Sequence, residues 1–428
     1  MRKLLEKILW ILAKLILVKY KPKIVGITGS VGKTGTKEAI YLTLSKKFNC
    51  FRNTKSYNNE IGVPLTVLLV QKTGGKSLLA WTRIFLHGLS LFLFPRRYPE
   101  ILIIEMGVEK PHDMDYLLSL FRPNFAVLTA IGKIPVHVEF FKNPEELMKE
   151  KAKLILGLNE KDTAILNYDD EKIKVLKDKT KARVITFGFQ EEADVWADSI
   201  GFSEERINSL PRGLVYKLHY QEDMVPVRLP YLFSRHQIYA TLAAAACGLS
   251  LEMNLIEISE GLKRFKPPPG RMNLIKGIKN TLIFDDSYNS SPDAAKAALE
   301  TLRKFEVKGR KIVCFGDMLE LGEYTEEAHR EIGKFVSEVA DILCVVGFAS
   351  RFISDEARKQ GMSEENVFEF DDSTECGRFV QEIIKPHDLI LVKGSQAIRM
   401  EKTVKELMAE PLKAKKLLVR QEEEWERK

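Results

Sequence analysis

Hydrophobic residues in this chain alternate between short apolar runs and longer stretches with helical spacing. Up to about Pro268, buried strands are predicted at residues 23–27, 101–105, 125–129 and 164–167, with helices beginning near Lys33 and Pro144. Strands that alternate with helices in this way predict a doubly wound α/β domain.

A run of three prolines, residues 267–269, interrupts this pattern, because proline cannot continue a helix or a central strand. A second alternating series follows, with strands expected at residues 281–285, 311–315, 342–346, 367–370 and 389–392. It is Rossmann-like but has no G-x-G-x-x-G motif. We therefore expect an N-terminal helix (1–23), a central domain (24–268), a C-terminal domain (269–411) and a charged tail (412–428).

Two segments are both apolar and basic. Residues 1–23 contain seven cations against Glu6, and residues 71–99 contain five against no acidic residue. The first segment predicts an amphipathic helix, and the second is interrupted by Arg83 and His87, so neither predicts a transmembrane helix. Two interpretations stay open: the segments pack as a small subdomain, or they lie in the face of an anionic bilayer.

Composition narrows the class of protein. The chain has 428 residues, 45% hydrophobic and 29% charged, which is typical of a soluble globular protein. Its net charge of +7 resides in the two basic segments, which argues against nucleic-acid binding by the rest. Five cysteines without C-x-x-C spacing predict neither disulfides nor a zinc site and fit a reducing cytoplasm.

Residues 24–38, IVGITGSVGKTGTKE, predict a phosphate-binding loop between a strand and a helix. Gly29 and Gly32 let the backbone approach phosphate oxygens, Lys33 can reach the β and γ phosphates, and the Thr34 hydroxyl can bind Mg²⁺. The motif predicts a protein that binds a nucleoside triphosphate.

The loop is shorter than the general form, since only Ser30 and Val31 separate its two glycines. Further motifs occur at residues 57–66, 105–107, 270–273, 285–289, 316–322 and 392–395. Together they resemble the Mur ligase family over about residues 23–410, and in particular its D-alanyl-D-alanine-adding branch. Val31 and Gly35 depart from the family pattern, which usually has Asn and then Thr or Ser at these positions.

The resemblance implies two Mg²⁺ ions. Thr34 and Glu105 would hold the first, because Glu105 ends a buried strand expected beside the loop. His137 and a carbamylated Lys151 would hold the second, with Lys153 a weaker candidate for the modified lysine. Lys33, Lys151, His137 and Arg271 would be the catalytic residues.

The resemblance also implies that ATP lies between the domains. Its contacts would be the loop residues Gly29, Ser30, Gly32, Lys33, Thr34 and Gly35, together with His236, Gln237, Arg271, Asp286 and Tyr288. Gln237 and Ala240 replace the asparagines usual in the family's adenine-binding stretch. Substrate contacts would be Asn58, Asn59, Asp317, Glu320 and Lys393.

The activity implied is cytoplasmic, ATP- and Mg²⁺-dependent ligation of D-alanyl-D-alanine to a cell-wall precursor through an acyl phosphate. The family's usual N-terminal UDP-binding domain is not found before the loop, and residues 1–23 and 71–99 are expected to replace it, with possible contact to the inner face of the membrane. Two alternatives stay open: a related ligase with a folate or poly-amino-acid substrate, and a non-catalytic ATP-binding scaffold.

Overall fold

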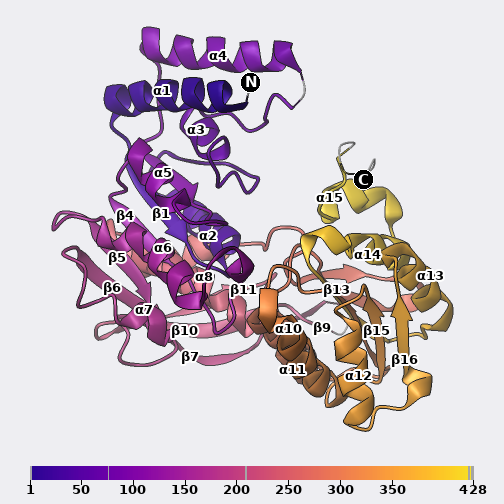
Figure 1. Cartoon of the computed structure of the whole chain (residues 1–428). Helices are drawn as coiled ribbons and strands as arrows, with labels where there is room; N and C mark the ends of the chain where they lie inside the picture. The colour runs from indigo at the N-terminus through magenta and orange to yellow at the C-terminus, as the bar shows by residue number, and fades with distance from the viewer. Residues whose placement is uncertain (1, 76, 208–209, 423–424, 426–428) are drawn as a thin grey trace.

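The computed structural model describes residues 2–75, 77–207, 210–422 and 425. Within them two α/β units lie side by side, each built on its own sheet (Figure 1). The strands of the first sheet are β1 (Lys23–Thr28), β2 (Cys50–Arg52), β3 (Ile101–Glu105), β4 (Phe125–Leu128), β5 (Thr163–Asn167), β6 (Arg183–Gly188), β7 (Val195–Phe202), β10 (Leu214–Tyr220) and β11 (Asp223–Leu229).

This nine-stranded sheet has the order β11-β10-β7-β6-β5-β4-β1-β3-β2. Neighbouring strands from β2 to β7 pair in parallel, whereas β7, β10 and β11 pair antiparallel. A separate pair, β8 (Arg206–Ile207) and β9 (Leu210–Pro211), is antiparallel. Ile27 lies opposite Glu105 in the β1–β3 register, so the phosphate-binding loop and Glu105 leave the sheet at the same edge.

Helices cover both faces of this sheet, as expected for buried parallel strands. Val25 and Ile27 of β1 face one core, which includes side chains of α2, α8 and α9, while Ile24 faces the other, which includes side chains of α1, α3, α4, α5 and α6. The helices of the first unit are α1 (Arg2–Tyr20), α2 (Lys33–Leu44), α3 (Gly62–Val67), α4 (Leu78–Leu93), α5 (Asp113–Leu120), α6 (Pro144–Leu156), α7 (Glu171–Lys174), α8 (Ile238–Ser250) and α9 (Leu255–Leu262).

The second unit contains the six-stranded sheet β12-β13-β17-β14-β15-β16, parallel except for the β12–β13 pair. Its strands are β12 (Asn273–Lys276), β13 (Leu282–Asp286), β14 (Lys311–Gly316), β15 (Ile342–Val346), β16 (Val367–Phe370) and β17 (Leu389–Lys393). Its helices are α10 (Pro292–Lys304), α11 (Thr325–Ser337), α12 (Arg351–Lys359), α13 (Ser373–Ile383), α14 (Glu401–Leu407) and α15 (Ala414–Leu417).

The first basic segment forms α1, and the second forms α4, which packs on it at one end of the molecule (Figure 1). Gly88 of α4 is buried between α1 and the end of α3, where a Cβ would lie 2.3 Å from Leu68 Cδ2 and 3.4 Å from Leu12 Cδ1. Lys19 Nζ donates to the carbonyl oxygens of Leu91, Phe92 and Phe94 at 2.8–2.9 Å, which neutralises the C-terminal end of α4. No helix in the part of the chain described here is long and apolar enough to cross a membrane.

The predicted fold class is confirmed, and each predicted strand is present within one or two residues of its expected ends. The antiparallel strands β7, β10 and β11 were not predicted, because they alternate buried and exposed positions instead of forming apolar runs. The proposed domain boundaries stay a prediction, although the change from one sheet to the next falls between β11 and β12, on either side of the prolines.

The packing of α11 on α12 leaves no room for a side chain at Gly333. A Cβ there would lie 2.5 Å from the Ile353 carbonyl oxygen, a backbone atom that cannot rotate away. We expect Gly333→Ala to lower the free energy of unfolding by about 1–3 kcal/mol despite its better helix propensity. Gly201→Ala is the matched control, because its Cβ would meet nothing within 4 Å. Urea unfolding measures both, and equal stability of the two variants would contradict the packing argument.

Candidate active site

The phosphate-binding loop forms a cradle at the end of β1. Gly29 and Gly32 have positive φ angles of 146° and 89°, which favour glycine. The Ser30 amide donates to the Ala130 carbonyl at 2.7 Å, and the Thr129 hydroxyl donates to the Val31 carbonyl at 2.6 Å. Thr129 and Ala130 directly follow β4, which is the neighbour of β1 in the sheet. They therefore hold the loop from one side.

Glu105 lies beside the first turn of α2. The Thr34 hydroxyl is 3.2 Å from Glu105 Oε2 and 3.2 Å from the Ser56 hydroxyl, and the Asn58 amide donates to Glu105 Oε1 at 3.4 Å. Glu105 is only 3% exposed. Hydroxyl and carboxylate oxygens are the ligands that Mg²⁺ prefers, so Thr34 and Glu105 form a donor set that fits this ion.

Two lysines in this region are shielded from solvent to different degrees, since Lys33 is half-buried and Lys151 is fully buried. Lys33 Nζ donates to the Gly29 carbonyl at 2.7 Å, and burial lowers its pKa despite the nearby Glu105. Lys151 on α6 is fully buried, with Nζ 3.5 Å from the Val108 carbonyl. Burial, reinforced by the positive charge of Lys33, lowers the pKa of Lys151 well below its ordinary value.

Lys153 has a different environment. It lies at the surface, paired with Asp115 at 2.5 Å and Glu150 at 2.7 Å. Burial is the largest single influence and opposes its charge, but the hydrogen bonds and charges of these two carboxylates together raise its pKa. Lys153 is therefore held as a cation, which is the form that cannot react with CO₂.

His137 lies in the loop between β4 and α6, with a left-handed backbone (φ 72°). Its Nδ1 is 2.5 Å from Glu320 Oε2, which belongs to the second unit. The two residues were predicted for different roles, a metal ligand and a substrate contact, and the structure joins them across the two units.

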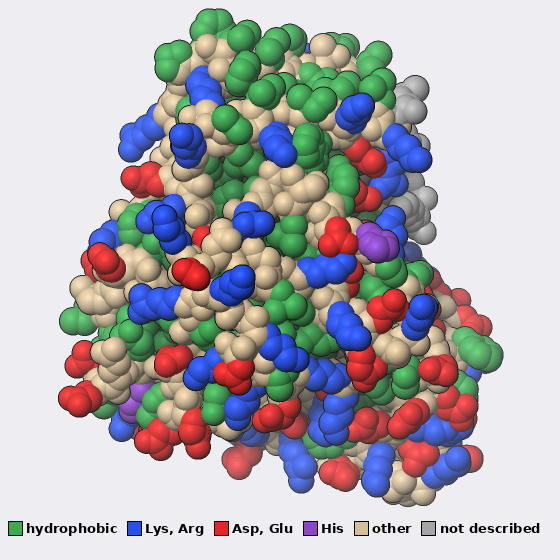
Figure 2. All heavy atoms as spheres, turned by 60° about the vertical axis from the view of Figure 1, so that its left-hand side comes forward, with side chains coloured by type: hydrophobic (Ala, Val, Ile, Leu, Met, Phe, Trp, Pro, Cys, Tyr) green, Lys and Arg blue, Asp and Glu red, His purple; other side chains and the backbone are tan. Residues whose placement is uncertain are grey.

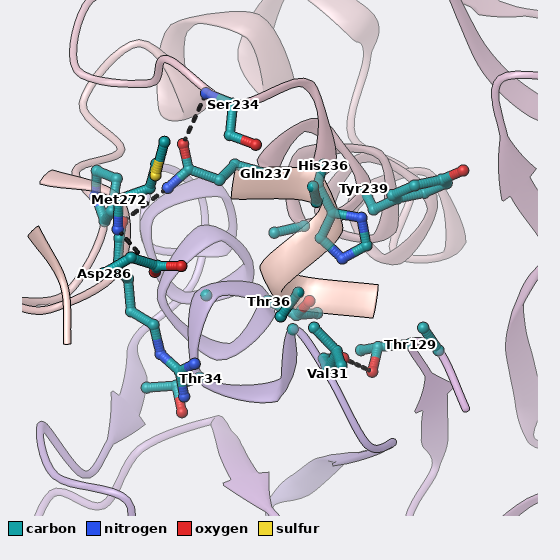
Figure 3. Close-up of a pocket in the computed structure, with 18 of the residues that line it drawn as sticks. Val31, Thr34, Thr36, Thr129, Ser234, His236, Gln237, Tyr239, Met272 and Asp286 are labelled. Atoms are coloured by element: carbon teal, nitrogen blue, oxygen red, sulfur yellow. Dashed lines mark hydrogen bonds between the residues drawn. The ribbon is translucent and has the colours of Figure 1, made fainter. Parts of the chain in front are cut away.

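A cleft opens between the two sheets, next to the loop. Its lining combines loop residues with residues of α8, the proline linker and the second unit, among them Gly32, Thr34, His236, Arg271 and Asp286 (Figure 3). Phe187, Phe265, Pro267, Pro268, Ala240 and Met272 supply apolar surface suited to a planar base.

His236 and Gln237 lie at the start of α8, and burial lowers the pKa of His236. Gln237 Nε2 donates to the Arg271 carbonyl at 2.9 Å, and Gln237 Oε1 accepts from the Ser234 amide at 3.3 Å (Figure 3). Gln237 thus ties the helix start to the linker. The Arg271 guanidinium lies 4.1 Å from the centre of the Tyr288 ring.

Asp286 and Lys393 form a buried pair on adjacent strands, with Lys393 Nζ 2.6 Å from Asp286 Oδ2. Burial lowers the pKa of Lys393, although Asp286 opposes that change. Asp286 Oδ1 also accepts from the Met272 amide at 3.0 Å. The Tyr288 hydroxyl donates to Ser56 at 2.9 Å and so connects the second unit to the Thr34–Glu105 group.

Two of the residues predicted to contact substrate, Asn59 and Asp317, accept hydrogen bonds from backbone amides of the protein. Asn59 Oδ1 accepts from the Gly62 amide at 3.0 Å, and Asp317 Oδ1 accepts from the Ser350 amide at 2.7 Å. Both side chains therefore stabilise turns. Asn58 differs, because it reaches Glu105. Gly35 lies in the first turn of α2, with Ala240 the nearest neighbour of a Cβ placed there.

Lys37 and Ser56 also contact the Thr34–Glu105 pair, but neither was predicted as a site residue. Lys37 is 1% exposed, its Nζ lies 3.4 Å from Glu105 Oε2, and it donates to the Lys55 carbonyl at 2.9 Å. The signal in the sequence was its position one helical turn after Lys33, which places it on the inner side of α2.

The family comparisons match this architecture. The sequence model of the Mur ligase middle domain matches residues 87–248, and that of the Mur ligase, glutamate ligase domain, matches residues 270–396. The fold, the loop and the cleft define an ATP-dependent ligase.

The chain belongs to the Mur ligase family. It is 30% identical to the UDP-N-acetylmuramoyl-tripeptide–D-alanyl-D-alanine ligase of Escherichia coli, over 90% of this chain and 76% of the relative. It is 28% identical to the Bacillus subtilis ligase of the same name, over 94% and 79%. The MurF ligase of Thermotoga maritima, solved with ADP, superposes with a TM-score of 0.75 at 25% identity, covering 94% of this chain and 83% of that one.

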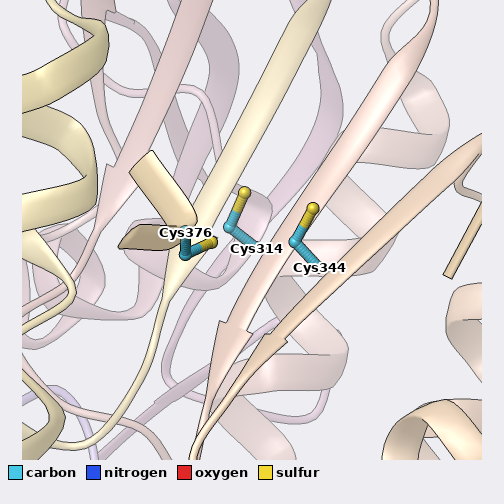
Figure 4. A group of neighbouring side chains, drawn as sticks. All are labelled: Cys314, Cys344 and Cys376. Atoms are coloured by element: carbon cyan, nitrogen blue, oxygen red, sulfur yellow. The ribbon is translucent and has the colours of Figure 1, made fainter. Parts of the chain in front are cut away.

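A further cluster lies away from the cleft, inside the second unit. Cys314 on β14, Cys344 on β15 and Cys376 on α13 have sulfur atoms within 4.8 Å of one another, and all three are fully buried (Figure 4). They are part of an apolar core. Hydrogen bonds to the other two thiols raise the pKa of Cys314 well above its ordinary value and lower the pKa of Cys376 to about 5. The pKa shifts thus differ within the cluster, and it is full burial in an apolar core that keeps reagents away from all three thiols.

We expect these three thiols to resist the thiol reagent DTNB at pH 8 in the native protein and to react after unfolding in urea. Labelling followed by peptide mass spectrometry identifies the modified residues. Stoichiometric cobalt(II) binding to native protein, with a thiolate charge-transfer band that Cys344→Ser removes, would contradict this prediction.

Proposed function

We propose that this protein is a ligase that joins D-alanyl-D-alanine to a UDP-linked muramoyl tripeptide in peptidoglycan synthesis. The proposal rests on one juxtaposition: the phosphate-binding loop and Thr34 line a cleft between the two units, and Thr34 contacts buried Glu105 behind it. Lys151 is buried close enough to Lys33 of the loop for the two charges to interact. The names of its relatives supply the substrate pair. Ligation would proceed through an acyl phosphate at the tripeptide's carboxylate.

The chain's own residues meet the main electrostatic problem of this reaction. A carboxylate that attacks the γ-phosphate of ATP brings two anions together, so the site needs positive charge at the transferring group. Lys33 supplies one cation from the loop, and Arg271 supplies another from the linker side of the cleft. Mg²⁺ bound by Thr34 and Glu105 would supply further positive charge at the phosphates.

Lys151, rather than Lys153, is the residue we propose to be carbamylated. Its neutral amine adds to CO₂ and releases one proton, which turns a buried lysine into an anionic oxygen ligand for a second Mg²⁺. The lowered pKa increases the fraction of Lys151 that is present as the neutral amine. His137 would share this ion, which requires His137 to leave Glu320.

The test of the proposed function is phosphate release from ATP and Mg²⁺ with UDP-linked muramoyl tripeptide, with and without D-alanyl-D-alanine. We expect release only with both substrates, and a product heavier by the dipeptide less one water. Lys33→Ala should abolish release, because it removes the loop's cation. A folded protein that binds ATP but gives no product would favour the scaffold alternative or another acceptor, such as a lipid-linked one.

The lysine assignment is tested with the matched pair Lys151→Met and Lys153→Met. We expect Lys151→Met to lower kcat about 100-fold or more, and Lys153→Met to change it less than about twofold. After addition of ¹³C-bicarbonate, ¹³C NMR should detect a carbamate carbon in the wild type and in Lys153→Met only. Acidification should remove the signal, since protonated amine does not bind CO₂. A carbamate retained in Lys151→Met would reverse the assignment.

Location is part of the same proposal. We propose a cytoplasmic enzyme that works near the inner face of the membrane, with contact through residues 1–23 and 71–99. A ligase with a folate or poly-amino-acid substrate is the alternative within the same fold, and the substrate dependence of phosphate release distinguishes the two.

A further inference from the structure

The outer apolar face is the exposed aliphatic surface of α1 and α4, made by Leu4, Ile8, Ile11, Leu15 and Val18 of α1, Leu78, Leu79, Leu86, Leu89 and Leu93 of α4, and the adjoining Phe94. These are 11 of the 19 exposed large hydrophobic side chains among the described residues, so apolar exposure is concentrated here. Figure 2 shows hydrophobic side chains gathered over this end of the molecule.

The exposed apolar residues of α1 are regularly spaced. The exposed residues of α1 recur every three or four positions, which places them in one row along the helix. The opposite side of α1 carries Leu9, Ala13 and Ile16, which are fully buried against the core. A helix that is apolar on both sides is normally covered on both sides. Something apolar is therefore expected to cover the outer row.

Charge identifies the covering partner. Lys3 and Lys7 are exposed beside the row on α1, and Arg83, Arg96 and Arg97 are exposed on or after α4. The acidic residue on α1, Glu6, is already paired with Arg2 at 2.8 Å. Basic side chains around this apolar end are visible in Figure 2. Apolar side chains bordered by cations match a bilayer that has an acyl interior and anionic headgroups.

The helices α1 and α4 are also held together before the outer apolar face meets any partner. The three hydrogen bonds from Lys19 fix α4 against α1, and the tight packing of Gly88 on Leu68 fixes α4 against the end of α3. Since the face is already ordered, little conformational entropy is lost on docking.

We propose that the outer apolar face docks the protein on anionic lipid bilayers, with α1 and α4 lying in the membrane interface. This surface does not include the cleft, so docking and ligation can be tested separately.

The experiment is co-sedimentation of the full chain with vesicles of phosphatidylcholine alone, or with about 30% phosphatidylglycerol, at low and high salt. We expect binding to the anionic vesicles at 50 mM NaCl, at least about fivefold weaker at 500 mM and weaker still on neutral vesicles. Absence of binding to anionic vesicles, or equal binding to both kinds, would overturn the proposal.

Variants separate the two contributions. Ile11→Gln with Leu86→Gln should weaken vesicle binding about tenfold or more, and Lys7→Gln with Arg83→Gln several-fold at low salt only. The matched control is Ile256→Gln with Phe348→Gln, two exposed apolar residues elsewhere, which should bind as the wild type does. Phosphate release with soluble substrates checks that every variant is folded.

Light scattering tests the competing occupant, a second copy of the chain. We expect a monomer at micromolar concentration without lipid. A dimer that Ile11→Gln with Leu86→Gln converts to monomer would overturn the membrane assignment in favour of self-association.

Discussion

The buried carboxylate of Glu105 is the interaction on which the rest of the site depends. The parallel register of β1 and β3 places it opposite Ile27, one residue before the loop strand ends. A buried carboxylate needs compensating charge, which Lys37 supplies at 3.4 Å. Thr34 and Asn58 then orient its two oxygens. Loop, helix and neighbouring strand are thus held in one geometry before any nucleotide binds.

Contacts between the two units extend this geometry across the cleft. Tyr288 reaches Ser56, Gln237 holds the Arg271 carbonyl, and His137 faces Glu320. The C-terminal segment adds another contact, since Glu422 pairs with Lys55 of the first unit at 2.6 Å. Apolar contacts accompany these polar ones, since Phe233 of the first unit packs on Phe284 and Phe305 of the second, with ring centres 5.8 and 6.1 Å apart.

The sequence was sufficient for nine of the strands and for the loop, because these depend on local pattern. Buried parallel strands are continuous apolar runs, and the loop has its glycines and lysine in order. It was insufficient where a side chain's partner lies far along the chain. Lys37 resembles an exposed helical lysine until β3 brings Glu105 beside it, and Asp317 resembles a substrate ligand until it caps the turn at Ser350. The three-cysteine cluster was missed because its members come from three separate elements.

The two interpretations of the basic segments do not exclude each other. The buried side of α1 fits the interpretation that the segments pack as a subdomain, since Leu9, Ala13 and Ile16 join the core of the central sheet. The outer side is then free to contact a bilayer, as the second interpretation requires, because its aliphatic row contributes nothing to that core. A helix that needed only to pack would have a polar outer face. Since α1 is apolar on both sides, packing explains half of its sequence, and the outer half calls for a second apolar partner.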